Sequence, residues 1–544
     1  MRAKRTLTIG DAFAEAMQAY HQGKAANALR LAKQLAETNP NFGGAHYLLG
    51  LLALDKGRVA AAIGHLARAL AITPDEPALH FAMASALERS DDVNSAILHY
   101  RSVLAADPLH AEANARLGEL LRRSGKRDEA IEHCRKVVAA SSTHVEALNC
   151  LGALMLESGQ TEEAARHLKA ALEIRPSWAV ALNNYGLALH RLGRLEEAAT
   201  IIEGAVDIKP DHAGFRANLA AALRALGRLE QARAEAERAV RADSHCVDAW
   251  IELGLVRQAQ GHAEGAAAAF DRAVGVEPRL PRAHWCLAEA CRTLGQDQRA
   301  ARHYRVCLNL DPDDSHGAAL ALALVGGAPA PDKAPAAFLR QLFDEYADHF
   351  DAALVERLDY RAPALVAGAL ARVLRSDGGA LPTGLEVMDA GCGTGLMAPV
   401  LRPLAGRLAG IDLSSAMVAK ARERGLYDEL AEGDLVTLLA QRPDRYDLVA
   451  AADVLVYLGN LAPVMAAVHC CLRPQGVFAF TVERADGIAS YMLGPKSRYS
   501  HARDYVRSVT DDAGFDVVVL EDAVTRRDAG ADVPGLLAVL RRRE

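Results

Sequence analysis

Residues 177–210 read SWAVALNNYGLALHRLGRLEEAATIIEGAVDIKP, and this stretch decides the fold of the first half of the chain. It contains Gly193, then Ala198 five residues later, then Pro210 twelve residues after that. The same register returns every 34 residues without an insertion, which is the pattern of a repeat architecture. The alanines of the register are Ala28, Ala62, Ala96, Ala130, Ala164, Ala198, Ala232, Ala266 and Ala300.

The repeated glycine, alanine and proline each suit a different position in a pair of helices. The glycine ends the first helix, because a left-handed cap costs least without a Cβ; Asp91 replaces it in one repeat. The alanine lies where the two helices approach closely, and a larger side chain would push them apart. The proline stops the second helix, and Ser142 and Ser244 replace it in two repeats.

This register resembles the tetratricopeptide repeat, including the dipeptide Leu-Gly at residues 49–50, 117–118, 151–152 and 253–254. The resemblance covers residues 9–314 as nine repeats, and it implies an all-α solenoid whose concave groove holds a protein or peptide. Asparagines recur at two adjacent repeat positions, where their amides can bond an extended peptide backbone; they also fit ordinary solvated helix residues. These candidate groove contacts are Asn149, Asn183, Asn184 and Asn218.

The register stops after Pro312. Residues 315–335 are predicted to form a capping helix followed by a linker, because an apolar stretch gives way to GGAPAPDKAP at residues 326–335. From residue 336 to 544, short aliphatic runs bounded by glycine alternate with helical patterns. This alternation predicts a second domain with a mostly parallel α/β sheet.

Residues 385–395, LEVMDAGCGTG, are the most informative part of this second domain. They predict a buried strand, an acid near its end at Asp389, and a glycine-rich turn into a helix, where backbone amides can approach a ligand. Asp412 closes the next predicted strand and could accept both ribose hydroxyls of a nucleoside. Asp434 follows a third strand and could accept from an adenine amino group. Each acid also fits a helix cap or a turn.

Together with Asp453 and the stretch LRPQG at residues 472–476, this series resembles the class I S-adenosylmethionine-dependent methyltransferases. More narrowly, the chain resembles predicted bacterial methyltransferases that carry tetratricopeptide repeats at their N-terminus. The resemblance implies a Rossmann-like sheet of seven strands, ending in an antiparallel pair at residues 515–520 and 535–540, and it implies S-adenosylmethionine as the cofactor. The cofactor-binding residues that it implies are Asp389, Gly391, Gly393, Gly395, Asp412, Leu413, Asp434, Leu435 and Ala452.

Two further segments are predicted to close over this site. A helix with Tyr346 and Phe350 on one face precedes the first strand, and Tyr346 and Arg361 could reach the cofactor's carboxylate, although the same helix could simply pack on the sheet. Residues 496–501, KSRYSH, lie where related enzymes bind the acceptor, so Arg498, Tyr499 and His501 are candidates there. His501 and Tyr457 are the candidate catalytic residues.

Two functions remain open from these residues. The first is methyl transfer to an unidentified acceptor, with the solenoid recruiting a protein or peptide. The second is an assembly scaffold whose methyltransferase-like domain binds the cofactor but is catalytically silent. A nicotinamide oxidoreductase is disfavoured, because Asp389 already lies inside the strand.

Composition limits the other classes. Of 544 residues, 62 are Lys or Arg and 69 are Asp or Glu, and this net charge of −7 argues against a nucleic-acid or anionic-membrane binder. The nine cysteines show no metal or disulfide spacing, so no metal is expected. No apolar run reaches the roughly 18–20 residues of a membrane span. We expect a cytoplasmic protein.

Overall fold

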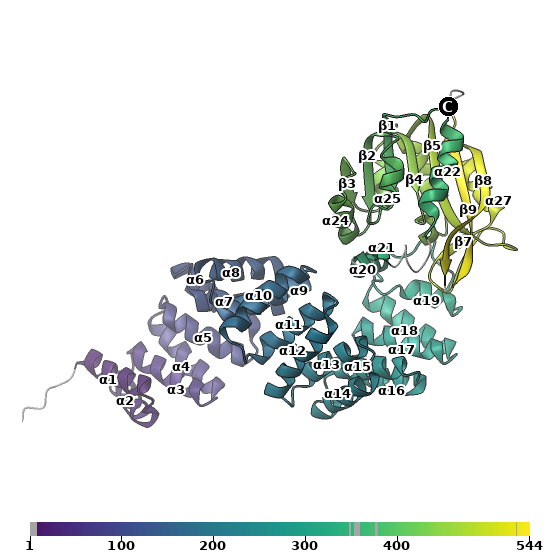
Figure 1. Cartoon of the computed structure of the whole chain (residues 1–544). Coiled ribbons are helices and arrows are strands. Elements are labelled where there is room, and N and C mark those ends of the chain that lie inside the picture. The colour runs from purple at the N-terminus through teal and green to yellow at the C-terminus, as the bar shows by residue number, and fades with distance from the viewer. Residues whose placement is uncertain (1–7, 348–349, 353–359, 376–378, 529) are drawn as a thin grey trace, which may run out of the picture. The chain divides into compact units, whose positions relative to one another are not determined.

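The structure is a computed structural model that describes residues 8–347, 350–352, 360–375, 379–528 and 530–544. It divides into two compact units, Met1–Val256 and Arg257–Glu544. Figure 1 labels the helices and strands.

Antiparallel helix pairs form the first unit. Its helices are α1 (Ile9–His21), α2 (Ala25–Thr38), α3 (Gly43–Asp55), α4 (Val59–Ile72), α5 (Pro77–Arg89), α6 (Val93–Ala106), α7 (Ala111–Arg123), α8 (Arg127–Ala140), α9 (Val145–Glu157), α10 (Thr161–Ile174), α11 (Ala179–Arg191), α12 (Leu195–Ile208), α13 (Ala213–Ala225) and α14 (Leu229–Ala242). Helix α15 (Val247–Ala259) spans the division between the units.

The helix pairs confirm the meaning of the 34-residue register. All nine register alanines are fully buried. Gly193 ends α11 with φ 72°, and Asp91, which replaces the glycine in one repeat, adopts the same left-handed conformation with φ 60°. The Leu-Gly dipeptide also has a packing reason: a Cβ on Gly152 would lie 2.5 Å from Cγ of Leu168, so only glycine lets α9 and α10 approach this closely.

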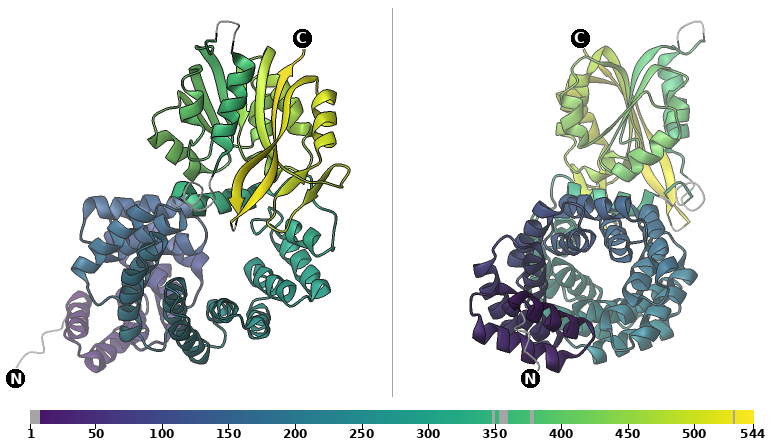
Figure 2. Two further views of the ribbon diagram at one scale, coloured as in Figure 1. Left: turned by 45° about the vertical axis from the view of Figure 1, so that its right-hand side comes forward. Right: turned by 90° about the vertical axis from the view of Figure 1, so that its left-hand side faces the viewer.

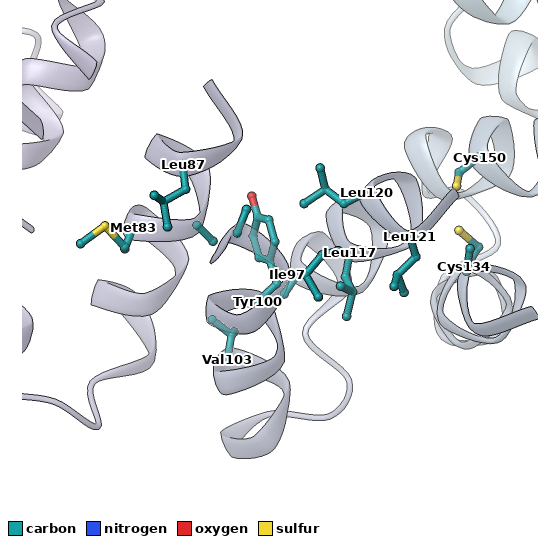
Figure 3. Close-up of a cluster of buried hydrophobic side chains, with 14 of the residues drawn as sticks. Met83, Leu87, Ile97, Tyr100, Val103, Leu117, Leu120, Leu121, Cys134 and Cys150 are labelled. Atoms are coloured by element: carbon teal, nitrogen blue, oxygen red, sulfur yellow. The ribbon is translucent and has the colours of Figure 1, made fainter. Parts of the chain in front are cut away.

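Leucines, alanines and single aromatic rings fill the core between successive pairs. Figure 3 shows one cluster across α5 to α9, in which Tyr100 lies among Leu87, Ile97 and Leu117. Tyr100 is fully buried, and its hydroxyl donates to Glu88 at 3.0 Å, so the ring packs in the core without leaving its polar end unpaired.

A polar pair joins the two helices of several repeats at one fixed register position. His80 and His99 share a hydrogen bond between their Nδ1 atoms at 2.8 Å, and His284 and His303 share the same contact at 3.0 Å. Asn114 takes the first position in another repeat, where its Oδ1 accepts from His133 at 2.7 Å.

The second unit begins with helices α16 (Ala263–Val276), α17 (Pro281–Thr293) and α18 (Asp297–Leu310), followed by the short helix α19 (Ala318–Leu324). Beyond α19, the segment predicted as a linker is attached to the sheet domain at residues 331–334, here named the strap. The Asp332 carbonyl accepts from Gly459 N at 2.8 Å, and Ala334 N donates to the Tyr457 carbonyl at 2.9 Å. Lys333 pairs with Leu458 as an antiparallel bridge.

Within the described residues, nine strands form one sheet. The strands are β1 (Leu385–Ala390), β2 (Ala405–Asp412), β3 (Glu429–Glu432), β4 (Tyr446–Ala451), β5 (Leu472–Arg484), β6 (Tyr491–Leu493), β7 (Tyr499–His501), β8 (Phe515–Asp528) and β9 (Ala531–Arg542). Strands β3, β2, β1, β4 and β5 are parallel neighbours in that order, and the antiparallel strands β9 and β8 follow β5. These are the seven strands expected, and a short hairpin of β6 and β7 is added at the carboxyl end of β5.

Helices cover both faces of the sheet (Figure 2). The apolar residues of α22 (Ala362–Leu374) and α23 (Ala398–Leu401) pack on one face, and those of α25 (Leu435–Ala440), α26 (Ala462–Cys471) and α27 (Arg503–Asp512) pack on the other. Helix α24 (Ser415–Glu423) connects β2 and β3. Helix α20 (Ala336–Tyr346), helix α21 (Phe350–Ala352) and the turn Leu455–Tyr457 lie near the carboxyl ends of the parallel strands, where they line the cavity described next.

Candidate functional site

A cavity of about 430 Å³ lies at the carboxyl ends of the parallel strands. The chain enters a turn or helix after each of these strands, so the residues just beyond β1, β2, β3 and β4 meet there. Most residues predicted for the site line this one cavity: Asp389, Gly391, Gly393, Asp412, Leu413, Asp434, Leu435, Ala452, Tyr346 and Tyr457.

The glycine turn after β1 is tightly packed on one side and open on the other. Gly391 has φ 77°, and a Cβ there would lie 2.5 Å from Cγ2 of Val454, so no other residue fits. Gly393 has φ 52°, and the nearest atom to a Cβ there is in the Phe350 ring at 3.8 Å. Gly395 does not line the cavity; a Cβ there would meet Arg424 at 3.0 Å.

Asp389 is buried at the end of β1, where its Oδ2 accepts from the Tyr427 hydroxyl at 2.5 Å. Burial raises the pKa of Asp389 to about 7, because the hydrogen bond from Tyr427 offsets only part of the lost solvation. A cation beside a buried carboxylate stabilises its ionised form, because the attraction between the charges compensates for the solvation lost on burial.

Asp412 faces the glycine turn from the end of β2. Its Oδ2 accepts from Gly393 N at 2.8 Å and its Oδ1 from Ser414 N at 2.9 Å. Burial raises the pKa of Asp412 despite these bonds. The alternative of a helix cap does not describe Asp412, because Ser414 caps α24 by accepting from Met417 N at 3.1 Å.

Asp434, in contrast, is a helix cap and a cavity residue at once. Its Oδ1 accepts from Thr437 N at 2.9 Å, at the start of α25, and its Oδ2 lies 3.3 Å from Lys333 Nζ of the strap. Although burial opposes ionisation, the Thr437 hydrogen bonds and the Lys333 charge hold the pKa of Asp434 below its usual value.

Helices α20 and α21 cover the cavity and are anchored by two aspartates. Asp344 accepts from the Ser414 hydroxyl at 2.5 Å, at the start of α24. Asp351 accepts from the Thr394 hydroxyl of the glycine turn and pairs with Arg424. Tyr346 and Phe350 both lie in the cavity wall, but α20 ends at Tyr346 and α21 begins at Phe350, so the structure does not show them on one predicted helix; residues 348–349 lie outside the described residues.

Arg361 does not line this cavity. It is exposed at the start of α22, its backbone N donates to the Thr525 carbonyl at 2.8 Å, and its side chain is not part of the cavity wall. The expectation that Arg361 reaches the cofactor is therefore wrong for this conformation, because α22 packs on the sheet behind the cavity.

His501 is also misplaced for catalysis. It is fully buried in β7, outside the cavity wall, and its Nε2 donates to the Leu458 carbonyl at 2.9 Å and lies 3.1 Å from the Gly459 carbonyl. Burial lowers the pKa of His501 to about 4. His501 therefore fastens the hairpin to the turn after β4, and the prediction that it acts as a base is wrong.

Tyr457, the other catalytic candidate, does line the cavity. Its ring meets Phe343 edge to face, with 5.5 Å between the ring centroids, and the guanidinium carbon of Arg498 lies 5.8 Å from its centroid. Burial raises the pKa of Tyr457, so its hydroxyl stays protonated at neutral pH.

Arg526 supports this end of the cavity and could not be found from the sequence. Only 2% of its side chain is exposed, and its Nη1 lies 2.5 and 2.6 Å from the two carboxylate oxygens of Asp453, which has φ 59°. Its Nη2 also pairs with Glu483 of β5. In the sequence, Arg526 stands in the polar stretch TRRDAG at residues 525–530, which has the composition of an exposed turn.

No cluster of three or more His, Cys, Asp or Glu side chains with metal-binding geometry lies in the part of the chain that the structure describes. No helix within the described ranges is long and apolar enough to cross a membrane.

A second cavity, of about 540 Å³, lies within the helix pairs of the first unit and is lined by Asn149 and Asn184. Asn184 Nδ2 donates to Asn149 Oδ1 at 3.1 Å, and Asn218 Nδ2 donates to Asn183 Oδ1 at 2.8 Å. The four asparagines thus form a ladder across three repeats, and two of them face the cavity.

Comparisons with known proteins agree with this architecture. Residues 388–480 match the family model described as a methyltransferase domain. Residues 13–77, 81–144, 152–213 and 252–315 match one model described as a tetratricopeptide repeat, and residues 189–253 match another.

Curated relatives match about a fifth of this chain. A ubiquinone biosynthesis O-methyltransferase of Azotobacter vinelandii is 30% identical over 106 residues, which are 19% of this chain and 46% of the relative. A malonyl-[acyl-carrier protein] O-methyltransferase of Pectobacterium atrosepticum is 35% identical over 109 residues, which are 20% of this chain and 42% of the relative. The chain thus spans less than half the length of these two relatives.

Among solved structures, an S-adenosylmethionine-dependent methyltransferase from Mesorhizobium loti is 21% identical, with a TM-score of 0.26, over 32% of this chain and 98% of that one. A tetratricopeptide repeat protein from Parabacteroides merdae is 18% identical, with a TM-score of 0.39, over 48% of this chain and 98% of that one.

Proposed function

We propose that this chain, which joins a tetratricopeptide-repeat solenoid to a class I methyltransferase domain, binds S-adenosylmethionine and transfers its methyl group to an acceptor. The observation that carries the proposal is the convergence of Asp389, Asp412 and Asp434 on one cavity beside the glycine turn. Three acids at the ends of adjacent parallel strands match the three polar parts of this cofactor.

The residues present fit the cofactor. Asp389 would accept from the amino group of its methionine part, and Asp412 would accept from the ribose hydroxyls. Asp434 would accept from the adenine amino group, against Leu435. The open side of Gly393 leaves room that a Cβ would take. When bound, the cofactor supplies an electrophilic methyl group on a sulfonium.

The remaining wall residues would hold the cofactor in place and keep water out. Leu413 and Ala452, which line the cavity, would flank the ribose and methyl ends, and Tyr346 on α20 would cover the methionine end. The anchors Asp344 and Asp351 fix α20 and α21 to α24 and to the glycine turn, so closure of the cover is coupled to the geometry of that turn. Alignment and exclusion of water are the main requirements of such a displacement.

Calorimetry of the full chain with S-adenosylmethionine tests the site. We expect Asp412→Ala to weaken binding by at least about tenfold, because the ribose hydroxyls lose a charged acceptor. Glu423→Gln is the matched control: it removes one carboxylate from α24, on an exposed side chain outside the cavity, and should bind as the wild type does. Unchanged binding in Asp412→Ala would remove the site assignment.

We also propose that the solenoid recruits a protein or peptide along the asparagine ladder, with Asn149 and Asn184 as direct contacts and Asn183 and Asn218 aligning the ladder. Labelled S-adenosylmethionine added with the full chain to cell lysate tests this. A double variant, Asn149→Leu with Asn184→Leu, should lose labelling of the recruited acceptor while binding S-adenosylmethionine normally. Labelling that persists in this variant argues against recruitment at the ladder.

A catalytically silent scaffold predicts a different result. It would bind the cofactor in the calorimeter, yet would yield no S-adenosylhomocysteine above background in the same lysate. Product that forms with wild type and disappears with Asp412→Ala excludes this second function.

A further inference from the structure

Part of the cavity wall has no place in the cofactor contacts proposed above. It consists of Phe343 on α20, Tyr360 before α22, Asp453 after β4, Tyr457 in the following turn, and Arg498 between β6 and β7. We name these five residues the acceptor wall. Tyr360 contributes a ring whose hydroxyl donates to the Ala452 carbonyl at 3.3 Å, so it is tied to the end of β4.

The two arginines at the acceptor wall differ in how closely they contact carboxylates. Asp453 and Glu483 are both held by Arg526, which is buried behind the wall. The closest carboxylate contact of Arg498 is longer: its Nη1 lies 3.8 Å from Glu483 Oε1, the same oxygen that Arg526 binds at short range. A charge-assisted hydrogen bond of a guanidinium measures about 2.7–2.9 Å, so this contact is an attraction and not a formed bond.

Arg498 is nevertheless held in place. Its guanidinium carbon lies 5.8 Å from the centroid of the Tyr457 ring, and Tyr457 is itself fixed edge to face against Phe343. Its side chain is about one quarter exposed, on the cavity side. The result is a guanidinium that lines the cavity beside two aromatic rings and interacts with Tyr457, a combination of groups that can recognise a planar carboxylate.

The acceptor wall also lacks a side chain ready to remove a proton. Asp453 is bound by Arg526 through both oxygens, and Tyr457 stays protonated at neutral pH. His501 lies outside the cavity wall, and its Nε2 bonds to the backbone carbonyl of Leu458. Among the described residues of this wall, the polar groups suit an acceptor that enters already deprotonated.

We propose that Arg498 binds the carboxylate of the methyl acceptor, and that the reacting part of the recruited acceptor is a small planar acid whose ring lies against Tyr457 and Phe343. This inference rests on the proposed methyl transfer and names the substrate class of the same cavity. The charges support it: the four groups Arg498, Arg526, Asp453 and Glu483 sum to zero, so an entering anion is balanced by the positive sulfonium of the bound cofactor.

Two isosteric probes test the proposal on the full chain. Benzoate and benzamide have the same ring and nearly the same shape, and only benzoate carries the charge. We expect protein loaded with the cationic cofactor analogue sinefungin to bind benzoate at least about tenfold more tightly than benzamide by calorimetry. Arg498→Gln should remove this preference, and Arg498→Lys should keep part of it because the charge remains.

Lys496→Gln is the matched control. It removes one positive charge two residues away, from a side chain that is 64% exposed and pairs with Asp528 outside the cavity, and it should keep the full preference for benzoate. Equal affinities for the two probes, failure of the loaded wild type to bind benzoate, or a preference that survives in Arg498→Gln would each overturn the proposal.

Failure of the proposed cofactor binding can be distinguished from failure of the acceptor assignment. Sinefungin binding is measured first in every variant, and a wild type that does not bind it fails the cofactor assignment. A wild type that binds sinefungin but does not prefer benzoate fails only the acceptor assignment. Thermal unfolding of Arg498→Gln, compared with Lys496→Gln, shows whether the fold is intact.

Discussion

Arg526 binds Asp453 through a single nitrogen that contacts both carboxylate oxygens, at 2.5 and 2.6 Å, although the two residues lie 73 positions apart in the chain. The pair is almost completely buried, and Asp453 N is also fixed, by donating to the Thr481 hydroxyl at 2.9 Å. The carboxyl end of β4 is thus held from behind by β8 and β5, which sets the position of the acceptor wall.

Removing Arg526 should strongly destabilise the sheet domain. Arg526→Met leaves Asp453 and Glu483 buried without their cation, which typically costs about 3–5 kcal/mol of unfolding free energy. Arg527→Gln is the control, because Arg527 is 48% exposed and its loss should change stability by no more than about 0.5 kcal/mol. Chemical denaturation of both variants measures the difference, and similar values would show that the buried pair contributes little.

Cofactor binding should depend on pH through Asp389. The cofactor-free protein holds a proton on Asp389 below its raised pKa of about 7, and an amino group can pair only with the deprotonated form. Affinity for S-adenosylmethionine should therefore fall as pH drops below about 7, by at most about tenfold for each pH unit. Calorimetry over that range measures the slope, and a flat profile would contradict it.

The variant Asp389→Asn separates binding from stability. The pKa of this acid is about 3.8 in the unfolded chain and about 7 in the folded protein. Asp389 therefore lowers the free energy of unfolding progressively as the pH rises from about 3.8 to about 7. The asparagine variant should bind S-adenosylmethionine poorly, yet unfold at a higher temperature than the cofactor-free wild type at pH 8. A lower unfolding temperature would show that the charge is better solvated than its burial indicates.

Replacing Gly391 by alanine should lower the free energy of unfolding more than replacing Gly425 does. Gly391→Ala places a Cβ 2.5 Å from Val454 and forces a left-handed φ, so both Val454 and the turn must shift. Gly425→Ala has a similar φ of 67° but open space, so only the backbone cost of about 1–2 kcal/mol applies. We expect Gly391→Ala to lose more stability and to abolish cofactor binding, which denaturation and calorimetry would measure. Equal losses would contradict the close approach.

Lowering the pH should destabilise the last helix pair of the repeats, α17 and α18, through His284 and His303. Burial, followed by the nearby His284, lowers the pKa of His303 to about 4, so the stability that its neutral form provides is lost as pH falls from about 6.5 to about 4. His284→Asn copies the Asn114–His133 pair found at the same register position and should reduce this loss. Thermal unfolding at pH 7 and pH 5 compares the two proteins; an identical acid shift in both would contradict the assignment.

The sequence was sufficient for whatever depends on local backbone chemistry. Ala198 and Gly193 stand at the helix contact and the left-handed cap that their spacing predicted. Strand β4, Tyr446–Ala451, follows the alternation of short aliphatic runs and helices predicted for this domain, because such a run between polar turns leaves one register for burial. The three acids converge because parallel strands end at one edge of the sheet.

What the sequence missed depends on long-range pairing. Strands β8 and β9 extend well beyond the predicted 515–520 and 535–540, and only this extension brings Arg526 to the acceptor wall. The stretch LRPQG at residues 472–476 lies within β5, where Leu472 pairs with Tyr446 and the register shifts before Val477 pairs with Leu448. His501 has the residue type of a base, but its direction is set by carbonyls from the turn after β4, which no local pattern records.

The strap at residues 331–334 determines how the chain can be divided. A protein started at Ala336 would keep every predicted strand and yet lack Lys333 and Ala334, two residues of the cavity lining, together with the backbone bonds to Tyr457 and Gly459. The sheet domain, with its cavity, therefore starts before its first strand and before its first covering helix. A protein that begins at Ala336 would expose the backbone groups of Tyr457 and Gly459 to solvent at the edge of the cavity.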